Sequence, residues 1–323
     1  MASSIYETTP LQSIEPPRVE WPEGRRFAFT IFDDPDGQRL EDMRLVYSFL
    51  ATLGFRTTVA VWPLGPRREP NSGGETCART EYRLFVKQLQ AAGFEVAFHS
   101  ATLHSSTRSE TAEGLDTFEQ CFGTPPLSMA NHYNQEAIYW GTARLTGPNR
   151  LIYNAMTLAR NDGRFFGHIE GDRHFWGDIC RERIRYCRNF VYSDINTLRA
   201  CPFMPYSDPL RPYVRQWFSA TEGDKAPRFL RTLEVDNQDR LEQEGGACIM
   251  YTHFGHGYVQ NGRLRPAFCR LMERLARKNG WFVPVSTLLD YLAAKRGVVV
   301  LTDIKRNYLE RRWIWEKLFR GTS

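Results

Sequence analysis

Two adjacent carboxylates, Asp33 and Asp34, follow a run of apolar and β-branched residues in FAFTIFDDPDGQ at 27–38. Successive side chains of a strand point to opposite faces, so the two can hold different roles, one as a metal ligand and the other as a base. A divalent cation also lowers the cost of keeping both ionised in a partly buried site. Asp-Asp-Pro-Asp-Gly is equally good turn chemistry, so this segment alone favours a turn and a metal site about equally. The third carboxylate, Asp36, has no assigned role.

Histidines at two other predicted strand ends favour the metal site. His99 ends the predicted strand 94–99 and His104 follows it in FHSATLHSS, so one loop can bring both imidazoles to one ion. His253 and His256 lie in YTHFGHG, where a predicted strand enters a glycine-rich loop. An imidazole there can act as a general acid, because histidine titrates near neutrality. At each position the alternative is a structural or solvent-exposed histidine.

A further polar cluster, Asn131 to Asn134, follows the predicted strand that begins at residue 127. Amide and imidazole groups suit hydrogen bonding to a hydroxylated ligand. We therefore assign Asn131, His132 and Asn134, together with His256, to substrate binding.

Strand-like and helix-like segments alternate along the chain and must position these groups. Strands are predicted at 27–32, 56–62, 94–99, 127–134, 151–156 and 281–285, and the segment 247–257 is predicted to be a strand that enters a glycine-rich loop. A Thr107/Glu110 capping box predicts a helix after the third strand. Repeated crossovers imply a mostly parallel sheet. Because several strand ends carry polar residues, the pattern favours a (β/α) barrel of about seven parallel strands over an open doubly wound sheet. Residues 160–245, rich in arginine, proline and aromatics, are expected to hold the largest loops and to shape the substrate pocket.

Composition limits the class of protein. The 323 residues are 42% hydrophobic and 24% charged, with a net charge of +5, which is typical of a globular protein and gives little reason to expect nucleic-acid binding. No linker divides the chain, so we expect one domain at 26–297 between an N-terminal extension, 1–25, and a basic tail, 298–323. Seven cysteines without CxxC spacing favour reduced thiols, and the first 26 residues contain no secretory apolar run. A cytoplasmic location is therefore expected.

Four segments together resemble the polysaccharide deacetylase family, which is carbohydrate esterase family 4 and has the NodB homology domain. They are TIFDDPDG at 30–37, GFEVAFHSATLH at 93–104, MYTHFGHG at 250–257 and WFVPVSTLLDYL at 281–292. The resemblance implies a distorted (β/α) barrel and metal-dependent removal of an acetyl group from an N-acetylated sugar or glycoconjugate. On the family's pattern Asp33 is the base and His253 the catalytic acid, and the metal ligands are Asp34, His99 and His104.

Three departures set this chain apart from the family's pattern. The paired histidines are five residues apart instead of four, and Pro35-Asp36 interrupts the usual Asp-Asp-Gly. The family's arginine motif, which orients the base, is replaced by ANHYN at 130–134, leaving Arg211 as one candidate partner. A catalytically inactive barrel that binds a glycan or protein partner therefore stays open, as does hydrolysis of another carbon–nitrogen amide bond.

Zinc is the expected metal for a His/His/Asp site, although ligand softness also permits cobalt, nickel or iron. The expected substrate is a cytoplasmic acetamido-sugar such as a nucleotide sugar, a lipid-linked intermediate or a glycosylated metabolite; the oligomeric state is left open.

The tail at 303–321 is predicted to be a helix. Ile304, Tyr308, Trp315 and Leu318 lie roughly on one side of it, and six lysines and arginines supply charge. A basic and aromatic helix can dock on an anionic membrane surface, which would place the protein at the inner face of the membrane. The more common alternative is a helix packed across the barrel with its arginines in water.

Overall fold

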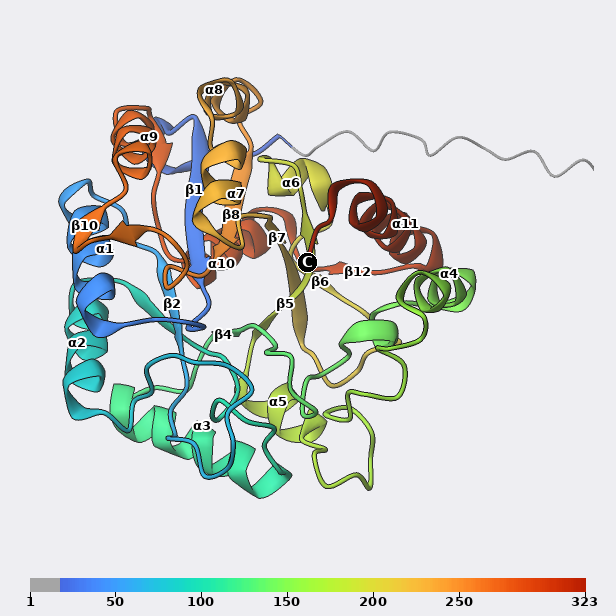
Figure 1. The fold of residues 1–323 in the computed structure, drawn as a ribbon. Helices are drawn as coiled ribbons and strands as arrows, with labels where there is room; N and C mark the ends of the chain where they lie inside the picture. The colour runs from blue at the N-terminus through green and yellow to red at the C-terminus, as the bar shows by residue number, and fades with distance from the viewer. Residues whose placement is uncertain (1–17) are drawn as a thin grey trace, which may run out of the picture.

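Seven parallel strands close into a barrel in the computed structural model, which describes residues 18–323 (Figure 1). Going round, they are β1 (Phe27–Asp33), β2 (Thr58–Val61), β3 (Glu95–Phe98), β4 (Ser128–Met129), β5 (Tyr186–Tyr192), β7 (Gln216–Thr221) and β8 (Ala247–Thr252). The ring closes because β8 pairs in parallel with both β7 and β1. The predicted distorted (β/α) barrel is therefore confirmed, and the two-residue β4 is one source of its irregularity.

Short strands extend this barrel outside the ring. β11 (Gly280–Trp281) runs parallel to β1, and β6 (Tyr206–Ser207) pairs antiparallel with β7 and parallel with β12 (Val299–Val300). A separate hairpin joins β9 (Val259–Gln260) to β10 (Arg263–Leu264).

Helices surround the barrel in Figure 1. They are α1 (Leu40–Thr52), α2 (Thr80–Ala91), α3 (Arg108–Phe122), α4 (Gly147–Thr157), α5 (Gly177–Arg183), α6 (Thr197–Ala200), α7 (Ala226–Thr232), α8 (Val235–Gln243), α9 (Pro266–Ala276), α10 (Val285–Arg296) and α11 (Asp303–Arg320), with 3₁₀ turns η1 (Pro22–Gly24) and η2 (Gly141–Arg144). The predicted capping box starts α3, since the Thr107 side chain accepts from the Glu110 amide and the Glu110 carboxylate accepts from the Thr107 amide.

Residues 151–156 form part of α4, and the prediction of a strand there is wrong. Pro148 stands in the first turn of the helix, where its missing N–H costs nothing. Asn149 and Tyr153, four residues apart, are buried, while Leu151 and Ile152 are exposed. This spacing is helical, because a strand would alternate buried and exposed side chains.

The segment 160–245, which we expected to hold the largest loops, contributes two strands to the barrel itself, β5 and β7. β5 is buried along its whole length but reads YCRNFVY, so Arg188 and Asn189 interrupt its apolar pattern. The domain boundaries at 26 and 297 stay predictions, and residues 1–17 of the predicted N-terminal extension lie outside the described residues.

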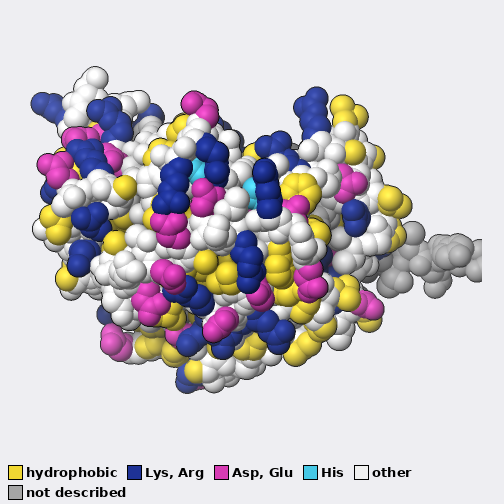
Figure 2. Space-filling model, turned by 90° about the horizontal axis from the view of Figure 1, so that it is seen from below, with side chains coloured by type: hydrophobic (Ala, Val, Ile, Leu, Met, Phe, Trp, Pro, Cys, Tyr) yellow, Lys and Arg dark blue, Asp and Glu magenta, His cyan; other side chains and the backbone are white. Residues whose placement is uncertain are grey.

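Charge is mixed on the face of the molecule shown in Figure 2, where lysine and arginine side chains alternate with aspartate and glutamate. Within residues 18–323, no helix combines the length and apolar character needed to cross a bilayer.

Candidate metal centre

Asp36, His99 and His132 converge at one end of the barrel. One ligand atom from each lies within 4.8 Å of the other two. The Nε2 atom of His132 is 3.0 Å from Asp36 Oδ1, and the Nε2 atom of His99 is 3.4 Å from Asp36 Oδ2. The three residues follow the carboxyl ends of β1, β3 and β4, which is where a barrel of this kind gathers its functional groups.

The donor set of this triad fits a divalent ion. Two imidazoles and a carboxylate are a usual protein ligand set for zinc and related metals, and they leave positions free for water and substrate. Burial alone would raise the pKa of Asp36, but hydrogen bonds from His132 and His99 outweigh it and hold that pKa far below its ordinary range. The Nδ1 atoms of both histidines are buried without a hydrogen-bond partner among the described residues.

Asp34 is not part of the triad, because a buried arginine binds its carboxylate. Arg188, from β5, approaches its two carboxylate oxygens at 2.9 and 2.5 Å, and each of the two side chains is only 3% exposed. The guanidinium also lies over the ring of Tyr251, 4.2 Å from its centroid. Asp34 Oδ1 is 3.9 Å from His99 Nδ1, so this ion pair borders the triad without being part of it.

Asp33 points into the core. Its carboxylate accepts hydrogen bonds from the Phe254 amide at 2.7 Å, from Tyr47 Oη at 2.9 Å and from Gln38 Nε2 at 2.9 Å. Burial raises the pKa of Asp33 well above its ordinary value, although these three hydrogen bonds oppose the shift. Asp33 therefore ties β1 to α1 and to the loop after β8, and it does not line the cavity beside the triad.

His104 lies outside the cluster, and the structure does not bring it to Asp34 and His99 as the resemblance implied. Its Nε2 atom accepts the backbone N–H of Arg67 at 3.0 Å, and its Nδ1 atom is 3.3 Å from Arg68 Nη2. His132, which we had assigned to substrate binding, takes the third position of the triad instead.

His253 faces the triad from the loop after β8. A backbone carbonyl can only accept, so the 2.7 Å contact between His253 Nδ1 and the Asp224 oxygen places the proton on Nδ1. Nε2 then faces Asp36 Oδ2 at 3.8 Å and Tyr251 Oη at 3.3 Å. The loop is fixed by close backbone packing, because a Cβ on Gly255 would lie 2.2 Å from the carbonyl carbon of Gly37.

The other predicted substrate-binding residues mostly hold loops. Asn131 lines the cavity, but its amide exchanges two 2.9 Å hydrogen bonds with the backbone of Ile138. Asn134 donates to the His104 carbonyl at 3.0 Å. His256 packs against Gly37, and its pKa is lowered by burial. Asn134 and His256 are not among the residues that line the cavity.

The cavity that joins these groups is small, about 180 Å³. Its wall comprises Asp34, Asp36, His99, Asn131, His132, Tyr133, Trp140, Arg188, Val191, Tyr251, His253 and Ser323. Ser323 belongs to the segment after α11, and the chain's C mark lies beside β6 and β7, on the α11 side of the barrel in Figure 1. Larger hollows exist elsewhere, but this one combines the triad, an ion pair and an imidazole.

Two of these groups, Arg188 and the ligand position of Asp36, were missed in the sequence. The sequence signal for Arg188 was a lone arginine inside the mostly apolar segment YCRNFVY. The signal for Asp36 was the third carboxylate of DDPDG. The suggested partner Arg211 instead pairs with Asp208 and Glu310 in a buried network away from the cavity.

Comparison with solved structures finds proteins with a similar barrel. The chain matches a Mycobacterium smegmatis structure assigned as a polysaccharide deacetylase, with a TM-score of 0.53 and 13% identity over 88% of this chain and 96% of that one. It also matches PuuE allantoinase, with a TM-score of 0.50 and 15% identity over 88% and 96% of the two chains. No protein-family model matches the sequence. No curated protein matches it either.

At these identities the likeness shows the fold. The resemblance that the motifs indicated is therefore confirmed at that level: the chain has the NodB-like barrel of the polysaccharide deacetylases, in a divergent form.

Proposed function

We propose that the protein is a metal-dependent hydrolase of a carbon–nitrogen bond, which removes an acetyl group from an N-acetylated sugar or glycoconjugate. The observation that carries this proposal is the meeting of the Asp36–His99–His132 triad, the Asp34–Arg188 pair and His253 in one cavity. A single chain rarely brings these three kinds of group together without chemistry to perform, since burying them is costly.

Asp36, His99 and His132 would hold the ion. A divalent metal in such a site supplies Lewis acidity and lowers the pKa of a bound water. The identity of the metal, with zinc as the expectation, stays a prediction.

Asp34 is the better candidate for the base than Asp33. Its carboxylate lines the cavity and is oriented by two hydrogen bonds from Arg188, whereas the carboxylate of Asp33 is fully buried and already accepts three hydrogen bonds. In this assignment Asp34 takes a proton from the attacking water. Arg188 holds the carboxylate in position as it does so.

His253 is suited to act as the acid. The Asp224 carbonyl fixes its ring and leaves Nε2 facing the cavity. A proton carried there can pass to the nitrogen of the leaving amine as the carbon–nitrogen bond breaks, so that acetate and a free amino sugar are released. Tyr133, Trp140 and Tyr251 give the cavity aromatic walls of the kind that stack on sugar rings.

Metal analysis of point variants tests the ligand set. We expect Asp36→Ala and His132→Ala to lose stoichiometric divalent metal, and His104→Ala, the matched control, to retain it. If His104→Ala loses the metal and His132→Ala keeps it, the ligand set is the one implied by the family pattern. If the wild-type protein binds no divalent metal, the proposal is wrong and an inactive binding barrel becomes the better explanation.

Acetate release from a panel of acetamido-sugars tests the reaction. Asp34→Asn should abolish release while metal content is kept. Hydrolysis of another amide is the second candidate, and the allantoinase match in fold supports including linear and cyclic amides in the panel. Turnover of those amides without acetate release would favour that candidate. The cytoplasmic location is part of the proposal and has its own test in cell fractionation.

A further inference from the structure

α11 presents its apolar side chains to solvent. Ile304 is 82% exposed, Trp315 51%, Leu318 52% and Phe319 71%. Their spacing of three, four and seven residues places Ile304, Trp315 and Leu318 on one stripe of the helix, with Arg311 between them. We call the exposed residues Ile304, Arg311, Trp315, Leu318, Phe319 and Arg320 the outer face of α11.

The opposite side of α11 anchors the helix, partly through charged groups. Arg306 pairs with Asp208 at 2.8 Å, and Glu310 accepts from the Thr146 amide at 2.9 Å. Leu309, Trp313 and Ile314 complete this buried side. The helix is therefore held on the barrel by this side alone, and its outer face is left in contact with solvent.

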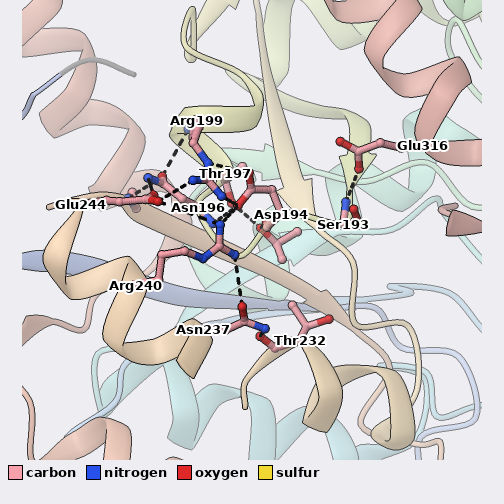
Figure 3. A network of polar contacts seen from close by, with 12 residues as sticks. Ser193, Asp194, Asn196, Thr197, Arg199, Thr232, Asn237, Arg240, Glu244 and Glu316 are labelled. Atoms are coloured by element: carbon pink, nitrogen blue, oxygen red, sulfur yellow. Dashed lines mark hydrogen bonds and ion pairs between the residues drawn. The ribbon is translucent and has the colours of Figure 1, made fainter. Parts of the chain in front are cut away.

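A basic hollow of about 760 Å³ adjoins this outer face, between α11, α6 and α8. Figure 3 shows its inner part, where arginines converge on Asp194. Arg199 pairs with Asp194 at 2.8 Å and with Glu244 at 2.5 Å, and Arg312 approaches Asp194 at 3.3 Å. These inner arginines are balanced by carboxylates.

The arginines at the rim of the hollow are not balanced in this way. Arg311 makes no ion pair or side-chain hydrogen bond within residues 18–323, and Arg320 donates to Ser193 Oγ at 2.9 Å. Arg320 also lies over the ring of Trp315, 5.4 Å from its centroid. Two positive charges thus stand beside exposed aromatic and aliphatic side chains.

We propose that the outer face of α11 docks the protein on a membrane surface that contains anionic phospholipids. Arg311 and Arg320 would contact lipid phosphates, while Trp315, Leu318 and Phe319 enter the boundary between head groups and acyl chains. The combination favours a membrane over a protein partner, because the two rim arginines complement an anionic surface and tryptophan prefers the membrane interface. This inference does not depend on the proposed function.

The docked face would lie close to the candidate cavity. Ser323 lines that cavity and is four residues after Phe319, a stretch that spans at most about 14 Å of chain. Trp313 Nε1 donates to the Ser323 carbonyl at 3.0 Å, and Lys317 donates to that of Thr322 at 2.9 Å, so the segment is tied to the helix. The cavity would therefore lie within a short distance of the membrane surface, where a membrane-bound substrate could enter it.

Vesicle co-sedimentation of the full-length protein tests the docking. Vesicles of phosphatidylcholine alone are compared with vesicles that contain about 30% phosphatidylglycerol, a fraction chosen to give a clear negative surface potential. We expect binding to the anionic vesicles at least roughly tenfold tighter than to the neutral ones, and weaker binding at high salt.

Two double variants separate the contributions. Trp315→Ser with Phe319→Ser and, separately, Arg311→Glu with Arg320→Glu should each weaken binding at least roughly tenfold while leaving the thermal unfolding midpoint unchanged. Leu84→Ser is the matched control, because Leu84 is equally exposed, at 53%, on the distant α2. Equal binding by control and variants, or equal binding to both vesicle types, would overturn the proposal. So would a concentration-dependent dimer that the Trp315 variant abolishes, because a second copy would then cover this face.

Discussion

Replacing Arg188 by methionine should destabilise the protein strongly. Arg188 and Asp34 are almost fully buried and joined by two short hydrogen bonds, so the substitution leaves a carboxylate without its partner in a medium of low dielectric constant. Breaking such a pair typically costs about 3–5 kcal/mol. At about 2 cal/mol/K of unfolding entropy per residue over this chain, the loss corresponds to a fall in the melting temperature of roughly 5–8 °C.

Urea denaturation at 25 °C measures this loss, and a double-mutant cycle shows where it comes from. Asp34→Asn in the Arg188→Met background removes the stranded charge, so the double variant should recover at least half of the stability lost in Arg188→Met. The coupling should persist at high salt, because a buried pair is poorly screened.

Arg150→Met is the matched control, because Arg150 contacts Asp162 at 3.0 Å on the surface. An exposed pair of this kind contributes at most about 1 kcal/mol. If Arg188→Met costs no more than Arg150→Met, or if the Asp34 and Arg188 effects simply add, the two side chains do not form a buried ion pair and Arg188 cannot position Asp34.

Three further predictions concern other parts of the molecule. Burial raises the pKa of Glu136 to about 7, so the native state holds a proton that the unfolded chain releases from about pH 4.5 upward. Glu136 should therefore lower stability by about 3 kcal/mol across this window, and Glu136→Gln should reduce the slope of stability against pH in denaturation curves by that amount. Gly255→Ala should reduce activity more than metal content, since its Cβ would collide with Gly37 and displace the His253 loop; unchanged kcat would contradict this. A thiol reagent should modify Cys121 and Cys269 quickly and the five buried cysteines only on unfolding, and rapid reaction of more than two thiols in the native protein would show that the core opens.

The fold could be predicted well where local patterns agree with the global arrangement. The seven-residue β1 is apolar up to Asp33, and α3 begins at its capping box, so both could be read directly from the sequence. β5 could not, because Arg188 and Asn189 are buried through contacts with Asp34 and Tyr206 that are 154 and 17 residues away in sequence. A pattern of neighbouring residues carries no trace of such partners.

The sequence correctly indicated which strand ends form the site, but not which side chains face the cavity. His99 and His253 lie where the motifs indicated, facing one cavity. The loop after β3 carries His104 to the Arg67 backbone, and the two extra residues before Gly37 carry Asp36 toward the imidazoles. Which of the three carboxylates and five candidate histidines face inward is decided by loop conformation, which one sequence does not determine.

The close backbone packing of Gly255 against Gly37 joins the loop after β8 to the loop after β1. With no side chain between them, the loop that carries Asp36 and the loop that carries His253 pack backbone against backbone, so we expect them to move together. Room for a bulky ligand is then expected to come from Tyr133 and Trp140, which line the pocket from the longer connection between β4 and η2. We expect sequence change that alters ligand size to accumulate at these two positions, while the glycine pair keeps the distance between the reacting groups constant.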